Sequence, residues 1–203
     1  MDPIDVPWIT KDDIFARAEA LLDEHELGDA PVEADYVLES IFDIEIVVAD
    51  ELYRTTSVHA FVAGGCRQVF VDREITLRDP AWYNYTLAHE VGHLVLHRQV
   101  FAAATHRTRA EFEAFRRRIG TAAYGRLESQ AHLFAGALIA PGRLLEATAD
   151  DVVGIVKAHG IELTPLLEVE WPTIFREIAR RMNANERTIA YRMEELGLYR
   201  KYI

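Results

Sequence analysis

Apolar residues recur every three or four positions over most of this chain, which is the spacing of one face of an α-helix. Thr10 can cap a first helix that runs to about Leu27, with an acidic face opposite its apolar one. Pro31 is well placed in the first turn of a second helix. The chain is therefore expected to open with two helices.

Three short segments between residues 44 and 71 follow a different pattern. Residues 44–48 are rich in β-branched side chains, and residues 59–63 form a short apolar run. Residues 68–71 follow the pair Gly64 and Gly65, which favours a turn. These segments predict a small antiparallel sheet.

The middle of the chain returns to the helical pattern. Asp79 and Pro80 end the strand region and start a strongly apolar helix over about 82–97. Further helices are expected over 109–118 and 121–139. We interpret the arginine-rich stretch from Arg107 to Arg118 as a solvated helix.

Beyond Pro141 the pattern is helical to the end. Gly160 and the pair Trp171 and Pro172 are the expected breaks. Residues 175–197 are typical of two short helices of a helix-turn-helix core.

The strongest chemical signal lies on the helix over 82–97. The segment from His89 to His93 reads H-E-x-x-H. Residues four apart project from the same face of a helix, so the two imidazoles can coordinate one metal ion. Glu90 can reach a water bound to that ion and take its proton. This spacing predicts His89 and His93 as metal ligands and Glu90 as a general base.

A catalytic zinc needs a third protein ligand. A metzincin would have Gly and His where this chain has Leu96 and Gln99, which excludes that class. A gluzincin takes a glutamate from a later helix instead. The downstream candidates are Glu111, Glu113, Glu128 and Glu146.

Glu128 is the best of these candidates by its register. It shares a helix face with Ala131 and Ala135, small residues that let another helix approach closely. The alternative for Glu128 is an ion pair with a neighbour such as Arg126, or simple exposure at the helix start.

These segments resemble the ImmA/IrrE family of metallopeptidases. The resemblance is carried by Leu-Ala-His-Glu-Val-Gly-His-Leu over 87–94, by Glu-Ser-Gln-Ala-His-Leu-Phe-Ala over 128–135, and by Pro141. It implies that Glu128 is the third ligand of one zinc ion per chain. The chain departs from the family pattern at His132, where Asn is usual, and in the long connection of 35 residues from His93 to Glu128.

The expected fold class is α+β and mostly helical. By the resemblance, residues 1–147 form a zincin-like (minigluzincin) domain with a small antiparallel sheet, and residues 148–203 form a helical, helix-turn-helix-like module.

Charge is distributed unevenly along the chain. The net charge of −11 divides into −13 over residues 1–60, −1 over 61–172 and +3 over 173–203. An acidic body repels phosphate backbones, so nucleic acid is not expected as a partner, although Arg187, Arg192 and Arg200 would be available to phosphates.

The compartment is predicted from what the sequence lacks. Its apolar stretches are shorter than a membrane span, and its acidic first residues differ from a secretory signal. Cys66 is the only cysteine, which excludes an intrachain disulfide. A cytoplasmic protein that does not enter a membrane is expected.

The resulting prediction is a zinc-dependent endopeptidase. The resemblance implies a protein substrate, a helix-turn-helix transcriptional repressor that acts in a stress or mobile-element response. Manganese is a second possible metal. One alternative is a DNA- or partner-binding regulator with a structural or inactive zinc site, and another is a toxin or inhibitor of a paired system that acts by proteolysis. His97, His106, Tyr124 and His132 are open candidates for an oxyanion donor, although the position of His97, one turn beyond His93, favours a residue that supports the metal ligands or belongs to the core.

Overall fold

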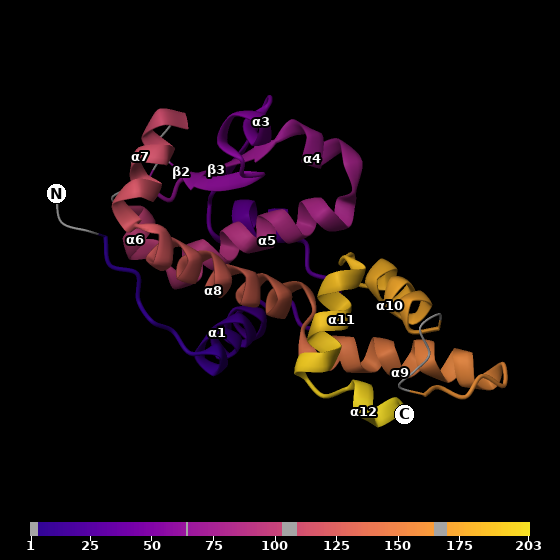
Figure 1. Ribbon diagram of the computed structural model, residues 1–203. Helices are drawn as coiled ribbons and strands as arrows, with labels where there is room; N and C mark the ends of the chain where they lie inside the picture. Colours follow the sequence, from indigo (N-terminus) through magenta and orange to yellow (C-terminus); the bar gives the residue numbers. More distant parts are fainter. Residues whose placement is uncertain (1–3, 64, 103–108, 165–169) are drawn as a thin grey trace.

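The computed structural model describes residues 4–63, 65–102, 109–164 and 170–203, with only the backbone described at residues 109 and 110. His106 and the start of the arginine-rich stretch lie outside the described residues. Helices dominate the described part and accompany one small sheet, which confirms the α+β class (Figure 1). None of the described helices combines the length and the apolar character that a membrane crossing needs.

The sheet has three strands in the order β1-β3-β2: β1 (Glu45–Ala49), β2 (Ala60–Ala63) and β3 (Gln68–Asp72). β2 and β3 form the expected antiparallel pair. β1 instead runs parallel to β3, so the expectation of a purely antiparallel sheet is wrong for this strand. The reason is the connection that follows β1, which contains the short helix α3 (Leu52–Thr56). After this connection β2 and β3 form a hairpin, and β3 is the strand of that hairpin that lies beside β1.

Two long helices, α5 (Pro80–Leu96) and α8 (Thr121–Ile139), lie against each other below the sheet in Figure 1. The Asp79 side chain caps α5 by accepting a hydrogen bond from the Ala81 N–H at 3.0 Å. A Cβ atom on Gly92 would lie 3.1 Å from both the Cα and the carbonyl oxygen of Ala131. The prediction that Ala131 permits a close helix approach is therefore confirmed, and Gly92 contributes to it.

Helix α1 (Lys11–Glu24) packs against α8 through one apolar face. Thr10 caps it as predicted, by accepting a hydrogen bond from the Asp13 N–H at 3.2 Å. The second expected helix is short, with α2 (Ala34–Tyr36) continuing as a π-helical turn, η1 (Val37–Ile41).

The arginine-rich stretch is not simply a solvated helix. Its described part belongs to α7 (Arg109–Ile119), in which Phe112, Phe115 and Ile119 are buried. Phe112 stacks on Phe61 of β2, with 4.9 Å between the ring centroids. The prediction of a solvated helix rested on the arginines of the polar face, whereas the apolar face of the helix determines where it packs. Helices α4 (Arg73–Arg78) and α6 (Arg98–Ala102) were not predicted.

Four helices gather at the C-terminal end of α8 (Figure 1): α9 (Gly142–Ala158), α10 (Glu170–Arg181), α11 (Glu186–Glu195) and α12 (Tyr199–Tyr202). The expected break at Trp171 and Pro172 lies inside α10, because proline is tolerated in a first helical turn, where N–H groups lack intrahelical partners. Since α9 runs through the expected boundary between residues 147 and 148, the domain division stays a prediction.

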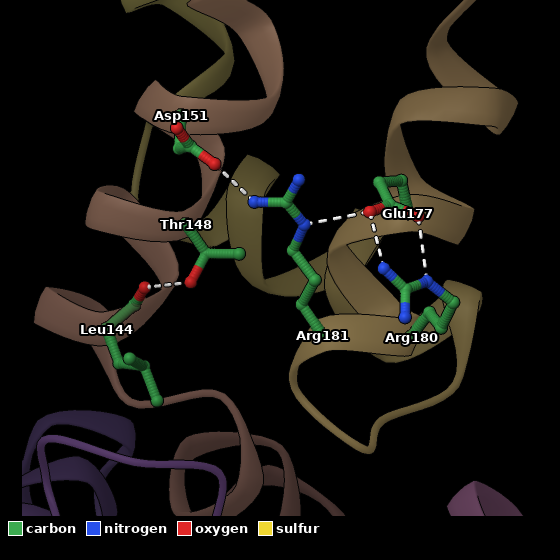
Figure 2. A network of polar contacts seen from close by, with 6 residues as sticks. All are labelled: Leu144, Thr148, Asp151, Glu177, Arg180 and Arg181. Carbon is green, nitrogen blue, oxygen red and sulfur yellow. Dashed lines mark hydrogen bonds and ion pairs between the residues drawn. The ribbon is translucent and has the colours of Figure 1, made fainter. Parts of the chain in front are cut away.

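One ion pair of the network in Figure 2 joins α9 to α10, and the others lie within α10. The Glu177 carboxylate accepts hydrogen bonds from Arg180 at 2.8 and 2.9 Å and from Arg181 Nε at 2.8 Å. The other end of the Arg181 guanidinium pairs with Asp151 of α9. These two arginines are therefore engaged within the module.

Candidate metal centre

His89 and His93 lie one turn apart on the buried part of α5, with 4.6 Å between their ring centroids. Glu128, near the middle of α8, faces both rings. Its Oε2 lies 3.2 Å from His89 Nε2, and its Oε1 lies 3.7 Å from His93 Nε2. The close crossing of α5 and α8 brings together the three residues that the sequence singled out as ligands.

The surroundings of Glu128 favour its charged form. Burial alone would raise the pKa of its carboxyl group, but the hydrogen bond to His89, the nearby His93 and the Tyr124 hydroxyl together lower it to about 2. Arg126, the alternative partner, instead donates to the Val6 carbonyl oxygen at 2.8 Å. Glu128 is thus a carboxylate aimed at two imidazoles, which is the donor chemistry of a zinc site.

The other glutamates considered as third ligands lie elsewhere. Glu146 pairs with Lys201 at 2.8 Å, and Glu113 faces Arg117 at 3.9 Å. Glu111 has an exposed side chain. Glu90 and Glu128 are the only carboxylates among the described residues that line the pocket at His89 and His93.

A chain of hydrogen bonds fixes the orientation of His93. The Gln130 side-chain N–H₂ faces the Pro7 carbonyl oxygen at 3.2 Å, so its Oε1 is turned toward His97 Nε2, 2.7 Å away. An amide oxygen only accepts, so His97 Nε2 carries a proton and His97 Nδ1 accepts from His93 Nδ1, at 3.2 Å. The lone pair of His93 Nε2 is left directed toward Glu128 and the pocket, as a metal ligand requires.

Glu90 is buried between the two histidines and has one unused oxygen. Its carboxylate accepts a hydrogen bond from the Val62 backbone, whereas Oε2 has no hydrogen-bond partner. Burial raises the pKa of Glu90 to about 7, against the opposing effect of His89. A buried acceptor without a partner is costly unless something polar joins it, and a pKa near neutrality suits a general base.

His132 adds a third imidazole at the edge of this cluster. Its ring lies 4.3 Å from that of His89, and its Nδ1 lies 2.9 Å from the Tyr85 hydroxyl. Two overlapping triads have ligand atoms within 4.8 Å of one another, namely His89 with Glu128 and His132, and His89 with Glu90 and His93. Tyr85 was missed by the sequence reasoning, although it stands four residues before His89 and so shares its helix face.

A pocket of about 270 Å³ opens over these residues. It is lined by the segment from Ser57 to Val62, by histidines and glutamates of α5 and α8, and by Phe112 and Phe115 of α7. Tyr124 lines the same pocket. A cluster of two imidazoles, a charged carboxylate and a buried base is therefore open to a ligand from outside.

The fold and the cluster define an α+β protein with a histidine–glutamate site between two helices. No family model matches the chain, and no curated protein matches it. Among solved structures, a Mycobacterium tuberculosis transcriptional regulator is similar, with a TM-score of 0.56 and 15% sequence identity over 90% of this chain. The match covers 46% of that protein, so this chain spans about half its length. At this identity the likeness shows the fold alone.

Proposed function

We propose that this chain is a zinc-dependent endopeptidase of the cytoplasm, acting on a protein substrate such as a helix-turn-helix repressor. The observation that carries the proposal is the position of Glu128, within 3.2 Å of His89 and 3.7 Å of His93, beside a buried Glu90 with one unpartnered oxygen. The residue types are those of a catalytic zinc site, with three protein ligands and a separate carboxylate base.

The roles of the residues follow from their contacts. His89, His93 and Glu128 would hold the ion, and zinc when bound supplies a Lewis acid and lowers the pKa of water. Glu90, held by the Val62 N–H, is poised to accept a proton at its free Oε2. His97 and Gln130 keep the ligand nitrogen of His93 unprotonated.

An inactive or purely structural metal site is the weaker alternative. A structural zinc site usually has four protein ligands, often cysteines. The sole cysteine, Cys66, hydrogen-bonds the Arg98 carbonyl oxygen and is absent from the pocket lining. A base such as Glu90 would have no use in a site that only holds the fold together.

A DNA-binding regulator is the second candidate function, because the similar solved structure is that of a transcriptional regulator. The arginines of the C-terminal helices argue against it. Arg180 and Arg181 are engaged by Glu177 and Asp151, and Arg192 is 4% exposed and bonded to Glu195 and to the Ala140 carbonyl oxygen. The expectation that Arg192 is available to phosphates is therefore wrong, because it is buried under α8. Arg187 and Arg200 remain as exposed cations.

The decisive experiment compares wild type with Glu90→Gln and Glu128→Gln. Each purified protein is assayed for bound zinc and manganese by mass spectrometry, and for cleavage of any helix-turn-helix repressor that is encoded beside its gene. We expect about one zinc per chain in wild type and in Glu90→Gln, cleavage by wild type alone, and loss of zinc in Glu128→Gln. Glu74→Gln, at an exposed position of α4, is the control and should bind metal and cleave as wild type does.

The same samples separate the candidates. Zinc in every variant and no cleavage of the repressor or of a proteome-derived peptide library would reject the peptidase. Tight, sequence-dependent binding of duplex DNA that weakens steeply with salt would instead support the regulator.

A further inference from the structure

A second hollow, of about 490 Å³, adjoins the candidate metal centre. The two hollows share Trp82, Tyr85 and His132, so they form one continuous surface. The far side of the second hollow is formed by α11, through Arg187 and Tyr191. A chain that passes over the metal centre can therefore continue onto the C-terminal helices.

Aromatic side chains line this surface and remain open to solvent. Trp82 stacks on Tyr85 with 5.9 Å between centroids, and Tyr85 in turn stacks on His132 at 6.0 Å. Trp82 is 40% exposed and Tyr191 is 54% exposed. Such rings offer a large apolar area at low entropic cost, as in many protein-binding surfaces.

Arg187 gives the hollow its charge. No ion pair joins Arg187 to a carboxylate in the part of the chain that the structure describes, and none of the described residues lining the hollow is acidic. Burial raises the pKa of Tyr85 while Arg187 opposes this effect, which indicates that the guanidinium lies near the aromatic surface. The chain as a whole carries a net charge of −11, whereas Arg187 places an unpaired positive charge beside the candidate site.

We infer that this hollow is a substrate subsite, in which Arg187 selects an acidic side chain of the peptide next to a large apolar residue that packs on Trp82 and Tyr191. The inference rests on the proposed peptidase function and specifies the class of sequence that the site accepts. Arg187 is a specificity residue and not part of the metal centre. It lies on α11, so the C-terminal module would take part in substrate choice without binding DNA.

The test uses binding as well as cleavage. Fluorescein-labelled octapeptides contain a central Leu-Tyr pair with two Glu or two Lys residues on one side. Each peptide is made in two versions, with the charged pair on the N-terminal or on the C-terminal side of Leu-Tyr. Anisotropy is measured with zinc-loaded Glu90→Gln protein, which is designed to bind without cutting. We expect at least one Glu peptide to bind roughly fivefold or more tightly than its Lys counterpart, and added salt to narrow this gap.

Two charge reversals locate the effect. Arg187→Glu, placed in the Glu90→Gln background, should abolish or invert the preference. Arg200→Glu makes the same charge change on α12 outside the hollow and should leave the preference intact. Equal binding of Glu and Lys peptides, or equal effects of the two reversals, would overturn the inference.

Cleavage provides an independent readout. A proteome-derived peptide library digested with otherwise wild-type protein should show acidic residues enriched on one side of the cut, and Arg187→Glu should remove this enrichment. Cleavage with no such enrichment rejects the subsite but keeps the peptidase. If nothing is cleaved but the Glu peptides still bind through Arg187, the proposed peptidase function fails while the peptide-selecting surface stands.

Discussion

The Nδ1 atoms of His93 and His97 lie 3.2 Å apart, one turn from each other at the end of α5. His97 is fully buried and is itself held by Gln130, whose amide is fixed by backbone carbonyl oxygens of the N-terminal segment. The orientation of the His93 imidazole, a proposed metal ligand, is thus set by contacts among α5, α8 and the N-terminal segment.

We expect His97→Phe to weaken zinc binding about 10- to 100-fold, because His93 loses the acceptor that fixes its tautomer and ring orientation. Competition with a zinc chelator of known affinity measures the change. Gln130→Met should act in the same direction, and the double variant should add little to either single change, since both act through one chain of bonds. Additive losses would show that the two residues act separately.

The close crossing of α5 and α8 predicts the effect of a single methyl group. Gly92→Ala places a Cβ 3.1 Å from the backbone of Ala131, so one helix must move. We expect a loss of about 1–3 kcal/mol in the free energy of unfolding, together with weaker zinc binding, since Glu128 moves with α8. Chemical denaturation measures the first effect and chelator competition the second.

Gly154→Ala is the matched control for this substitution. Gly154 lies inside α9, and a Cβ there would meet nothing within 4 Å. The change should be neutral or should stabilise the fold by about 0.5–1 kcal/mol, because alanine is the better helix former. A similar loss in both variants would mean that the helix crossing is not the cause.

The proximity of the proposed ligands on α5 could be predicted from sequence because it is local. His89, Glu90 and His93 lie within one helix, whose period fixes which side chains share a face. Glu128 could be ranked above the other glutamates by the small residues on its face, since helix packing requires them. The α+β class followed in the same way from local periods.

The remaining features depend on contacts between distant segments. The parallel pairing of β1 with β3 follows from the path of the chain through α3, which no residue of β1 encodes. The polar chain through Gln130 requires the N-terminal segment to lie against α8. The burial of Arg192 likewise depends on the packing of α11 against α8. The helical pattern of the sequence does not show this contact, so Arg192 was wrongly predicted to lie on the surface.

Zinc itself should stabilise the protein, because the ligands are brought together only in the folded chain. We expect the melting temperature to rise with added zinc and the gain to reverse with chelator. At a free concentration about 1,000 times the dissociation constant, the stabilisation is about 4 kcal/mol. Glu128→Gln should lose most of this gain, whereas Glu90→Gln should keep it. Loss of the gain in Glu90→Gln would make Glu90 a ligand and not a base.

The Glu177 ion pairs predict how the C-terminal helices respond to acid (Figure 2). The hydrogen bonds from Arg180 and Arg181 lower the pKa of Glu177 from 4.5 to about 2. A carboxyl group whose folded-state pKa is depressed contributes stability above its unfolded pKa and loses it as the pH falls toward the folded value. We therefore expect Glu177→Gln to be less stable than wild type at pH 7, with a difference that shrinks between about pH 4.5 and pH 2.

Thermal unfolding at a series of pH values measures this difference. Because the Glu177 side chain is 35% exposed, solvent screens its ion pairs, so the effect should be modest and should decrease in high salt. The double change Arg180→Gln and Arg181→Gln removes the partners, so adding Glu177→Gln to it should produce little further pH-dependent loss. If the loss persists in that background, the two arginines are not its source.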